Sequence, residues 1–286
     1  MIIIKCVGGL GNQMFLYALY KNFIKKNIEV YFDINDYKNY NLHNGYELDS
    51  IFNLKIKYAE NEDVERLKVN KKQYIKKFIR RINPDLISHK ILHPYLYNEE
   101  IFSLNNAYLE GYGQNIKYIK FVEKELREDF QYEVDSLDNI NKKYIEKIKK
   151  DKNSVSIHIR RGDYIDNDEA YKIYGGICEK EYFYEAVKKI KEKIENPNFY
   201  VFSNDIDWVK RNLKLNNATY INHNNGTDSY KDLILMSNCK HNIIANSTFS
   251  WWGAWLNSNI DKTVIMPNMW TNYQKNVLNY KGCILI

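Results

Sequence analysis

The sequence predicts an α/β protein built from two domains with parallel sheets. Its 286 residues suit two domains of about 140 residues, each large enough for its own core. A glycine-rich turn joins a strand-like segment at 2–7 to a helix-like segment at 14–26. Strand and helix patterns then alternate through the second half of the chain, which is typical of parallel sheets with helices on their faces.

The composition is that of an ordinary soluble protein. Hydrophobic residues make up 44%, charged residues 27%, and the net charge is +6, too mild to indicate a nucleic-acid partner. The four cysteines lie far apart without zinc spacing, which favours a reduced, cytoplasmic protein; they are Cys6, Cys178, Cys239 and Cys283. No apolar run approaches the roughly 20 residues of a membrane span, and the N-terminal run is too short for a signal peptide. The sequence leaves the oligomeric state open.

The N-terminal segments form a predicted βαβ unit. A buried strand at 2–7 meets the turn Gly8-Gly9-Leu10-Gly11-Asn12-Gln13, a helix covers 14–26, and a second strand covers 29–33. Such a turn can bring backbone N–H groups close to a ligand. Its spacing differs from the dinucleotide fingerprint, and a tight turn before a helix explains it equally well.

A basic amphipathic pattern follows at 64–82. Its polar face carries eight cations against Glu65 alone: Arg66, Lys68, Lys71, Lys72, Lys76, Lys77, Arg80 and Arg81. This face could contact an anionic membrane surface, although a solvated face is the more common explanation. The segment 108–114 predicts a short strand that breaks into a loop, and a helix is predicted at 119–130. The polar, lysine-rich segment 135–152 predicts the boundary between domains 1–150 and 151–286.

The second domain repeats strand and helix in a regular order. Strands are predicted at 154–160, 199–203, 218–222, 241–245 and 263–266, the last strand of the chain. Helices are predicted near 179–195, 206–214, 228–238 and 249–257. This order predicts a doubly wound parallel sheet.

The first of these strands alternates in a period of two and ends in charged residues. Ser156, His158 and Arg160 share one side, and Arg161, Gly162 and Asp163 follow. In an open α/β sheet, ligands bind at the carboxyl ends of the strands. The pattern therefore predicts an anion site, unless the basic end is merely solvated.

Three further strand ends would meet at the same edge. They carry Ser203 and Asp205, then Asn222 and His223, then Asn246, Ser247, Thr248, Phe249 and Ser250. The last group begins a helix, where hydroxyl and N–H groups can bind phosphate, although helix capping would also explain the serine and threonine. Asp205 and Asp207 form a DxD triplet. Because acidic residues are favoured at a helix start, we predict capping or nucleotide contacts there and no bound metal.

Three motifs in order along the chain resemble the bacterial α-1,2-fucosyltransferases of glycosyltransferase family 11. They are Gly8-Gly9-Leu10-Gly11-Asn12-Gln13-Met14, His158-Ile159-Arg160-Arg161-Gly162-Asp163-Tyr164, and Asn246-Ser247-Thr248-Phe249-Ser250-Trp251-Trp252-Gly253-Ala254. The segment Asp232 to His241 belongs to the same pattern, and the resemblance runs from Met1 to about Trp270. Gly113 departs from it, since a large aromatic residue is expected there.

The resemblance implies a GT-B-like fold, with two Rossmann-like doubly wound domains facing a cleft. The first domain would face the acceptor and the second would bind GDP-fucose. The reaction would transfer L-fucose to the 2-hydroxyl of a terminal galactoside with inversion and without a metal or cofactor, in O-antigen or capsule synthesis. Such an enzyme could contact the cytoplasmic face of the inner membrane.

The same resemblance implies roles for individual residues. Arg160 would bind the β-phosphate and stabilise the leaving GDP, while His158 and Asp163 would hold that arginine or reach the nucleotide. Donor contacts would come from a wider set: Gly11, Asn12, Arg161, Ser203, Asp205, Asn222, His223, Asn246, Ser247, Thr248, Phe249 and Ser250.

The catalytic base stays open at this point. Acidic residues of the first domain are candidates: Asp33, Asp36, Glu47 and Glu110. Two other functions remain as alternatives. One is a fucosyltransferase of α-1,6 or O-fucosyl linkage, against which the double-Trp helix argues by resemblance. The other is a non-catalytic module that binds a glycan or nucleotide sugar.

Overall fold

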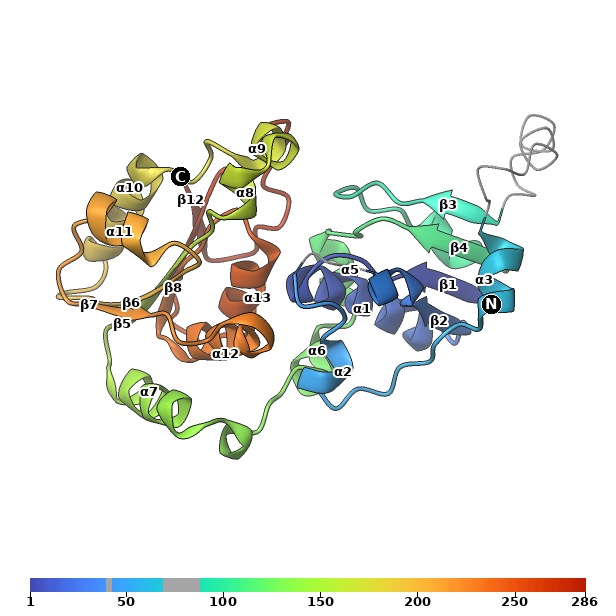
Figure 1. Cartoon of the computed structure of the whole chain (residues 1–286), viewed down its shortest axis with the longest axis horizontal. Coiled ribbons are helices and arrows are strands. Elements are labelled where there is room, and N and C mark those ends of the chain that lie inside the picture. The colour runs from blue at the N-terminus through green and yellow to red at the C-terminus, as the bar shows by residue number, and fades with distance from the viewer. Residues whose placement is uncertain (40–42, 69–87) are drawn as a thin grey trace. The chain divides into compact units, whose positions relative to one another are not determined.

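The computed structural model describes residues 1–39, 43–68 and 88–286, except for the side chain of Asp163. The chain forms two compact units, Met1–Gln131 and Tyr132–Ile286, and each is described by itself (Figure 1). In the described part, no helix is long and apolar enough to cross a membrane. The predicted basic face at 66–81 lies largely outside the described residues.

Unit 1 is built on a four-stranded parallel sheet in the order β2-β1-β4-β3. Its strands are β1 Ile2–Lys5, β2 Val30–Asp33, β3 His89–Ile91 and β4 Ala107–Glu110. Its described α-helices are α1 Leu10–Lys25, α2 Leu48–Ile51, α3 Asn61–Leu67, α5 Ile116–Phe121 and α6 Glu123–Asp129. Short 3-10 turns lie at Asn35–Asn39 and Glu100–Ser103.

Helix α1 begins earlier than the sequence predicted. Gly8 has a left-handed φ of +78°, a conformation that glycine adopts without strain. Gly9 is the extended N-cap, and the helix starts at Leu10. Gly11 and Asn12 therefore belong to the first helical turn, and the prediction that this helix starts at residue 14 was wrong.

Unit 2 contains a six-stranded parallel sheet in the order β12-β9-β8-β5-β6-β7. The strands are β5 Ser154–Ile159, β6 Asn198–Ser203, β7 Ala218–Ile221, β8 His241–Ile243, β9 Val264–Met266 and β12 Cys283–Leu285. A small hairpin pairs β10 Met269–Thr271 with β11 Gln274–Lys275. The doubly wound prediction is confirmed. However, β9 is not the last strand of this sheet, because Pro267 ends β9 and the chain returns as β12.

Helices cover both faces of this sheet. They are α7 Asn139–Lys150, α8 Asp163–Asp166, α9 Asp168–Tyr174, α10 Lys180–Lys191, α11 Ile206–Asn212, α12 Tyr230–Asn238 and α13 Thr248–Leu256; 3-10 turns lie at Val134–Ser136 and Gly226–Asp228. Val155, Ile157 and Ile159 pack with α10 and α11 in one apolar cluster. On the other face, α12 and α13 lie side by side (Figure 1). A Cβ on Gly253 would lie 3.1 Å from Cβ of Met236, so glycine permits this close helix contact.

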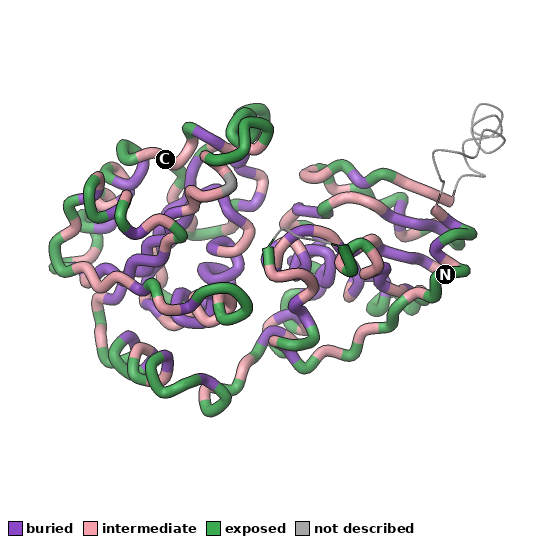
Figure 2. Tube along the Cα trace, viewed as in Figure 1, coloured by how far each residue is buried: buried purple, intermediate pink, exposed green. Residues whose placement is uncertain are grey.

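The boundary between the units lies before α7, whereas the sequence predicted it after residue 150. Asn141, Ile145 and Ile148 are the buried residues of α7, and this helix packs against α12 of unit 2. Its many lysines occupy the exposed face, so their number reflects an amphipathic helix and not a linker. The burial pattern of both units is seen in Figure 2, where the sheet strands are mostly buried.

Candidate functional site

The strand order of unit 2 defines one place for a ligand. From β5 the chain proceeds to β6 and β7 on one side, then returns to β8 and β9 on the other. The carboxyl ends of β5 and β8 therefore flank the topological switch point, where doubly wound sheets bind ligands. Arg160 follows β5 and Asn246 follows β8 by a few residues, so two of the predicted strand ends meet at this point.

One side of β5 carries a row of buried polar side chains beneath α12 and α13. Ser154 Oγ accepts from the backbone N–H of Lys240 at 3.0 Å. Ser156 Oγ accepts from Asn242 Nδ2 at 2.7 Å, and that amide is itself bound by Asn257. Only the last member of the row differs: His158 Nδ1 is buried and has no hydrogen-bond partner among the described residues.

His158 is a neutral imidazole placed against the helix that follows β8. Its side chain is buried, and its ring centroid lies 5.8 Å from that of Phe249 in α13. Burial, together with the positive charge of Arg160, lowers the pKa of His158 to about 3. A neutral ring can offer Nδ1 as donor or acceptor according to its tautomer. An unpaired buried polar atom costs about 1–3 kcal/mol, so a polar ligand atom at Nδ1 would be stabilising.

The two adjacent arginines have different surroundings. Arg160 is partly exposed, and its Cζ lies 5.8 Å from the ring centroid of Tyr164. Arg161 instead stacks on Trp208 at 3.8 Å and lies 3.5 Å from carboxylate oxygens of Glu179 and Asp205. Its charge is thus compensated within unit 2.

The turn after Arg161 depends on glycine. Gly162 has φ +29°, and a Cβ there would collide with the side-chain amide of Asn204. Asn204 Oδ1 accepts from the backbone N–H of Arg161 at 3.0 Å. This bond fixes the direction in which the chain leaves β5. The predicted contribution of the Asp163 side chain lies outside the described residues.

Of the residues after β8, some form hydrogen bonds within unit 2, and others keep side chains without a capping bond or partly exposed. Asn246 is buried, and its amide donates to the carbonyl oxygens of Tyr174 and Trp270 at 3.0 and 3.3 Å. Ser250 Oγ donates to the Ser247 carbonyl at 3.2 Å. Ser247 is the N-cap of α13, yet its side chain makes no capping bond, and Thr248 and Phe249 are partly exposed. The helix N-terminus can therefore accept an anion.

Three of the remaining predicted donor contacts of unit 2 are engaged locally. Ser203 Oγ accepts from the Asp205 N–H at 3.0 Å, and Asp205 caps α11 by accepting from Trp208 N–H at 3.0 Å. His223 stacks on Tyr144 with 5.3 Å between centroids. Asn222 is exposed. Their ligand contacts stay predictions.

Asp232 is a candidate that our sequence interpretation did not assign to the site. It lies in the first turn of α12, and Asn224 Nδ2 donates to it at 2.7 Å. Burial raises its pKa to about 7, and perturbed carboxyl groups of this kind are enriched at functional sites. The available signal was its position at the start of the segment 232–241, which we used only for the family resemblance.

In unit 1, the glycine-rich turn is closed by its own neighbours. Gln13 is fully buried, and Nε2 donates to the carbonyls of Gly8 and Gly45 at 2.9 and 2.8 Å, while Oε1 accepts from Glu47 N–H at 2.9 Å. Asn12 Oδ1 accepts from Gln114 Nε2 at 2.8 Å. The predicted donor contacts of Gly11 and Asn12 stay predictions.

The four base candidates differ in their surroundings. Asp36 is bound to Lys5 at 2.7 Å, which lowers its pKa. Burial opposes ionisation of Glu110, but Lys5 at 2.9 Å outweighs burial and lowers its pKa. Asp33 is buried and accepts from Tyr108 O–H at 2.7 Å. Burial raises the pKa of Glu47.

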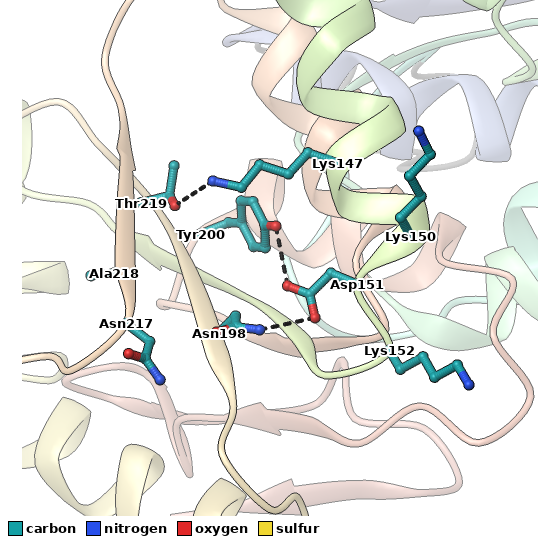
Figure 3. Close-up of a pocket in the computed structure, with 9 residues that line it drawn as sticks. All are labelled: Lys147, Lys150, Asp151, Lys152, Asn198, Tyr200, Asn217, Ala218 and Thr219. Carbon is teal, nitrogen blue, oxygen red and sulfur yellow. Dashed lines mark hydrogen bonds between the residues drawn. The ribbon is translucent and has the colours of Figure 1, made fainter.

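A cavity of about 630 Å³ lies at the opposite, amino-terminal edge of the sheet in unit 2. In Figure 3, Asp151 is bound by Tyr200 and Asn198, and Lys147 reaches Thr219. Lys150 and Lys152 point in other directions. Because the hydrogen bonds from Asn198, Tyr200 and Lys147 join lining residues to one another, we do not assign a ligand to this cavity. Within the described ranges, no group of three His, Cys, Asp or Glu residues could hold a metal ion.

Comparison with known proteins adds a family to this geometry. The sequence model described as glycosyl transferase family 11 matches residues 1–281. An alpha-1,2-colitosyltransferase of Escherichia coli is 34% identical over 283 residues, covering 97% of this chain and 94% of that protein. The O-antigen biosynthesis glycosyltransferase WbnK of Escherichia coli is 33% identical, covering 92% of each chain. Galactoside alpha-(1,2)-fucosyltransferase 1 of Homo sapiens is 30% identical over 105 residues, which are 36% of this chain and 28% of that protein.

Proposed function

The chain belongs to glycosyl transferase family 11, and we propose that it transfers a 6-deoxyhexose from a GDP-linked donor to the 2-hydroxyl of a terminal galactoside. The observation that carries the donor site is the unpaired, buried Nδ1 of His158 beside Arg160 at the switch point of unit 2. Arg160 and the N-terminus of α13 supply positive charge for a diphosphate. His158 supplies a neutral polar contact to the nucleotide.

The proposed reaction inverts the anomeric carbon. The bond between C1 of the sugar and the β-phosphate oxygen breaks, and its electron pair stays on GDP. The acceptor oxygen forms the new bond to C1 from the opposite face and loses its proton to a base or to water. Arg160 stabilises the charge that develops on the leaving phosphate, the kind of preorganised contact whose removal costs about 10²–10³-fold in rate. We assign no residue as the base for this step.

L-Fucose is the first proposed donor sugar, and colitose is the second. The motifs after β1, β5 and β8 resemble those of α-1,2-fucosyltransferases, which supports fucose. The relative named as a colitosyltransferase aligns over nearly the whole chain, which supports colitose, the 3-deoxy analogue of L-fucose. Both names include the α-1,2 linkage. A role in O-antigen synthesis is proposed from the relative WbnK.

The proposed chemistry needs no divalent ion, since Arg160 and the α13 N-terminus would neutralise the diphosphate. Peripheral contact with the cytoplasmic face of a membrane is proposed from the basic residues at 66–81. That enzyme would sediment with anionic vesicles at low salt and separate from them at high salt. Sedimentation independent of such vesicles at low salt would refute the contact.

The test is an assay of GDP release with EDTA present, using lactose or N-acetyllactosamine as acceptor. GDP-fucose and GDP-colitose are compared side by side, and the product linkage is read by NMR. We expect acceptor-dependent release and an α-1,2-linked product with at least one donor. Turnover that appears only with an added divalent metal would contradict metal independence. Absence of binding of either donor would contradict the proposed function.

A further inference from the structure

Tyr164 contacts groups from both sides of the switch point. It lies in α8, directly after the turn that follows β5. The Cζ atom of Arg160 lies 5.8 Å from the centroid of its ring, within the distance of about 6 Å at which a guanidinium is attracted to an aromatic face. Its hydroxyl donates to the carbonyl oxygen of Asn246 at 3.2 Å. Asn246 immediately precedes Ser247, the N-cap of α13.

Tyr164 is itself held by a closed set of contacts. Its ring stacks on that of Tyr174, with 4.8 Å between centroids and 16° between planes. Asn246 Nδ2 donates to the carbonyl of Tyr174 at 3.0 Å, so Tyr164, Tyr174 and Asn246 contact one another pairwise. A second bond from the same amide, to the Trp270 carbonyl at 3.3 Å, ties the set to β10. Asn246 is 3% exposed, and its amide makes both of these hydrogen bonds. Burial and the two bonds together fix the position of its carbonyl.

These contacts connect Arg160 with the N-terminus of α13. Arg160 projects from the loop after β5, and the α13 N-terminus follows β8. A guanidinium and a helix N-terminus can bind the same diphosphate only if the distance between them matches the spacing of the phosphate oxygens. The ring of Tyr164 limits where the Arg160 guanidinium can lie. The Tyr164 hydroxyl, which is bonded to the carbonyl of Asn246, fixes that ring relative to the start of α13.

We propose that Tyr164 is a positioning residue that fixes Arg160 relative to the N-terminus of α13 and so matches the site to the β-phosphate. This inference rests on the proposed function, because it assumes that GDP binds at the switch point. Tyr164 need not touch the ligand itself. A structural role without positioning would instead affect all nucleotides equally.

The test compares binding of GDP with binding of GMP, which lacks the β-phosphate, by isothermal titration calorimetry. Y164L removes both ring and hydroxyl and should lower the affinity for GDP by about three- to tenfold, with a change below about twofold for GMP. Y164F keeps the ring and should show a smaller loss, again confined to GDP. Y171L is the matched control, because Tyr171 is an exposed tyrosine of the neighbouring helix α9, and both affinities should stay unchanged.

A double-mutant cycle with R160A identifies the group through which Tyr164 acts. In the R160A background, Y164L should cause no further loss of GDP affinity. An equal loss for GDP and GMP, or a full Y164L effect without Arg160, would overturn the inference. If thermal unfolding shows that Y164L is not folded, the same comparison is made with Y164F, and an unchanged ratio of GDP to GMP affinity overturns it. Failure of the wild-type protein to bind GDP would instead refute the proposed function.

Discussion

The two units each contain a glycine turn after an inner strand of the sheet, and the buried polar side chains beside the two turns differ in how their atoms are used. In unit 1, Gln13 forms three hydrogen bonds to the backbone around the glycine turn, and it is fully buried. In unit 2, His158 is also buried but keeps Nδ1 without a partner among the described residues. A glycine-rich turn is therefore no sign of a ligand by itself. A buried polar atom left unpaired at a switch point is the more specific sign.

The largest expected effect separates the two neighbouring arginines after β5. R160A should lower kcat by at least about 10²-fold, because the charge on the leaving phosphate loses its partner. The thermal midpoint should change little, since Arg160 is partly exposed. R161A is the control. It should lower stability, because it removes the stack on Trp208 and the ion pairs with Glu179 and Asp205. Its kcat should stay within about tenfold of the wild-type value. Steady-state GDP release and thermal unfolding measure both, and a folded R160A protein with wild-type activity would contradict the mechanism.

A second pair of variants tests the contrast between the turns directly. Q13L removes the Gln13 partner of the Gly45 carbonyl and of the Glu47 N–H, while the Gly8 carbonyl keeps its bond from the Tyr37 hydroxyl. We therefore expect a loss of about 3 kcal/mol in the free energy of unfolding. H158F removes an unpaired nitrogen, so stability should stay unchanged or rise, while GDP affinity falls about tenfold through loss of one contact. Urea unfolding and calorimetry give the two quantities. Equal losses of stability in Q13L and H158F would contradict the claim that the Gln13 side chain is paired and His158 Nδ1 is not.

The pH dependence of stability gives a smaller effect. The pKa of His158 falls from 6.5 to about 3 on folding, so the unfolded chain binds the proton more readily. The free energy of unfolding should therefore decrease as the pH falls from 6.5 toward 3, by at most about 1.4 kcal/mol per pH unit from this residue. H158F should have a shallower slope than the wild type in urea titrations between pH 6.5 and 4.5. Identical slopes would show that His158 titrates normally.

The smallest expected effect comes from the glycines of the two turns. G162A must move the Asn204 amide and the backbone of the β5 turn, and we expect a loss of roughly threefold in GDP affinity. G8A has φ +78° and would place Cβ 2.5 Å from Asn12 Nδ2, which costs about 1–2 kcal/mol of stability. The new Cβ also displaces Asn12, a predicted donor contact, so we expect a loss of GDP affinity in G8A that is smaller than the loss in G162A. A larger loss of GDP affinity in G8A than in G162A would contradict the assignment of the GDP site to unit 2.

Much of the fold could be predicted because its signals are local. Alternation in residues 154–160 indicated β5. The alternation of strands and helices also predicted that the carboxyl ends of β5 and β8 lie at the same edge of the sheet, as they do in the structure. The start of α1 at Leu10 and the strand β12 were missed, because they depend on the backbone of Gly8 and on a pairing with β9 that is distant in sequence. Gly113, where an aromatic residue was expected, has φ +57°, a conformation that a bulky side chain disfavours.

The site was predicted less completely, because sequence does not show which polar groups pair with each other. Arg160 and Arg161 look equivalent in the sequence. In the structure, Arg161 lies 3.5 Å from carboxylate oxygens of Glu179 and Asp205, whereas Cζ of Arg160 lies 5.8 Å from the ring centroid of Tyr164. The double-Trp helix suggested a particular linkage, but Trp251 and Trp252 are fully buried and contribute to the core. Asp232 became a candidate only through its burial, which is a property of the folded chain.

The central claim is that His158 Nδ1 meets the donor nucleotide. Selective ¹⁵N labelling of the six histidines, with H158F to assign the resonance, allows this contact to be followed directly by NMR. On titration with GDP, we expect the His158 ring-nitrogen signals to shift strongly, while those of His89 in unit 1 remain in place. Binding of GDP with unchanged His158 signals would contradict the assignment of the site.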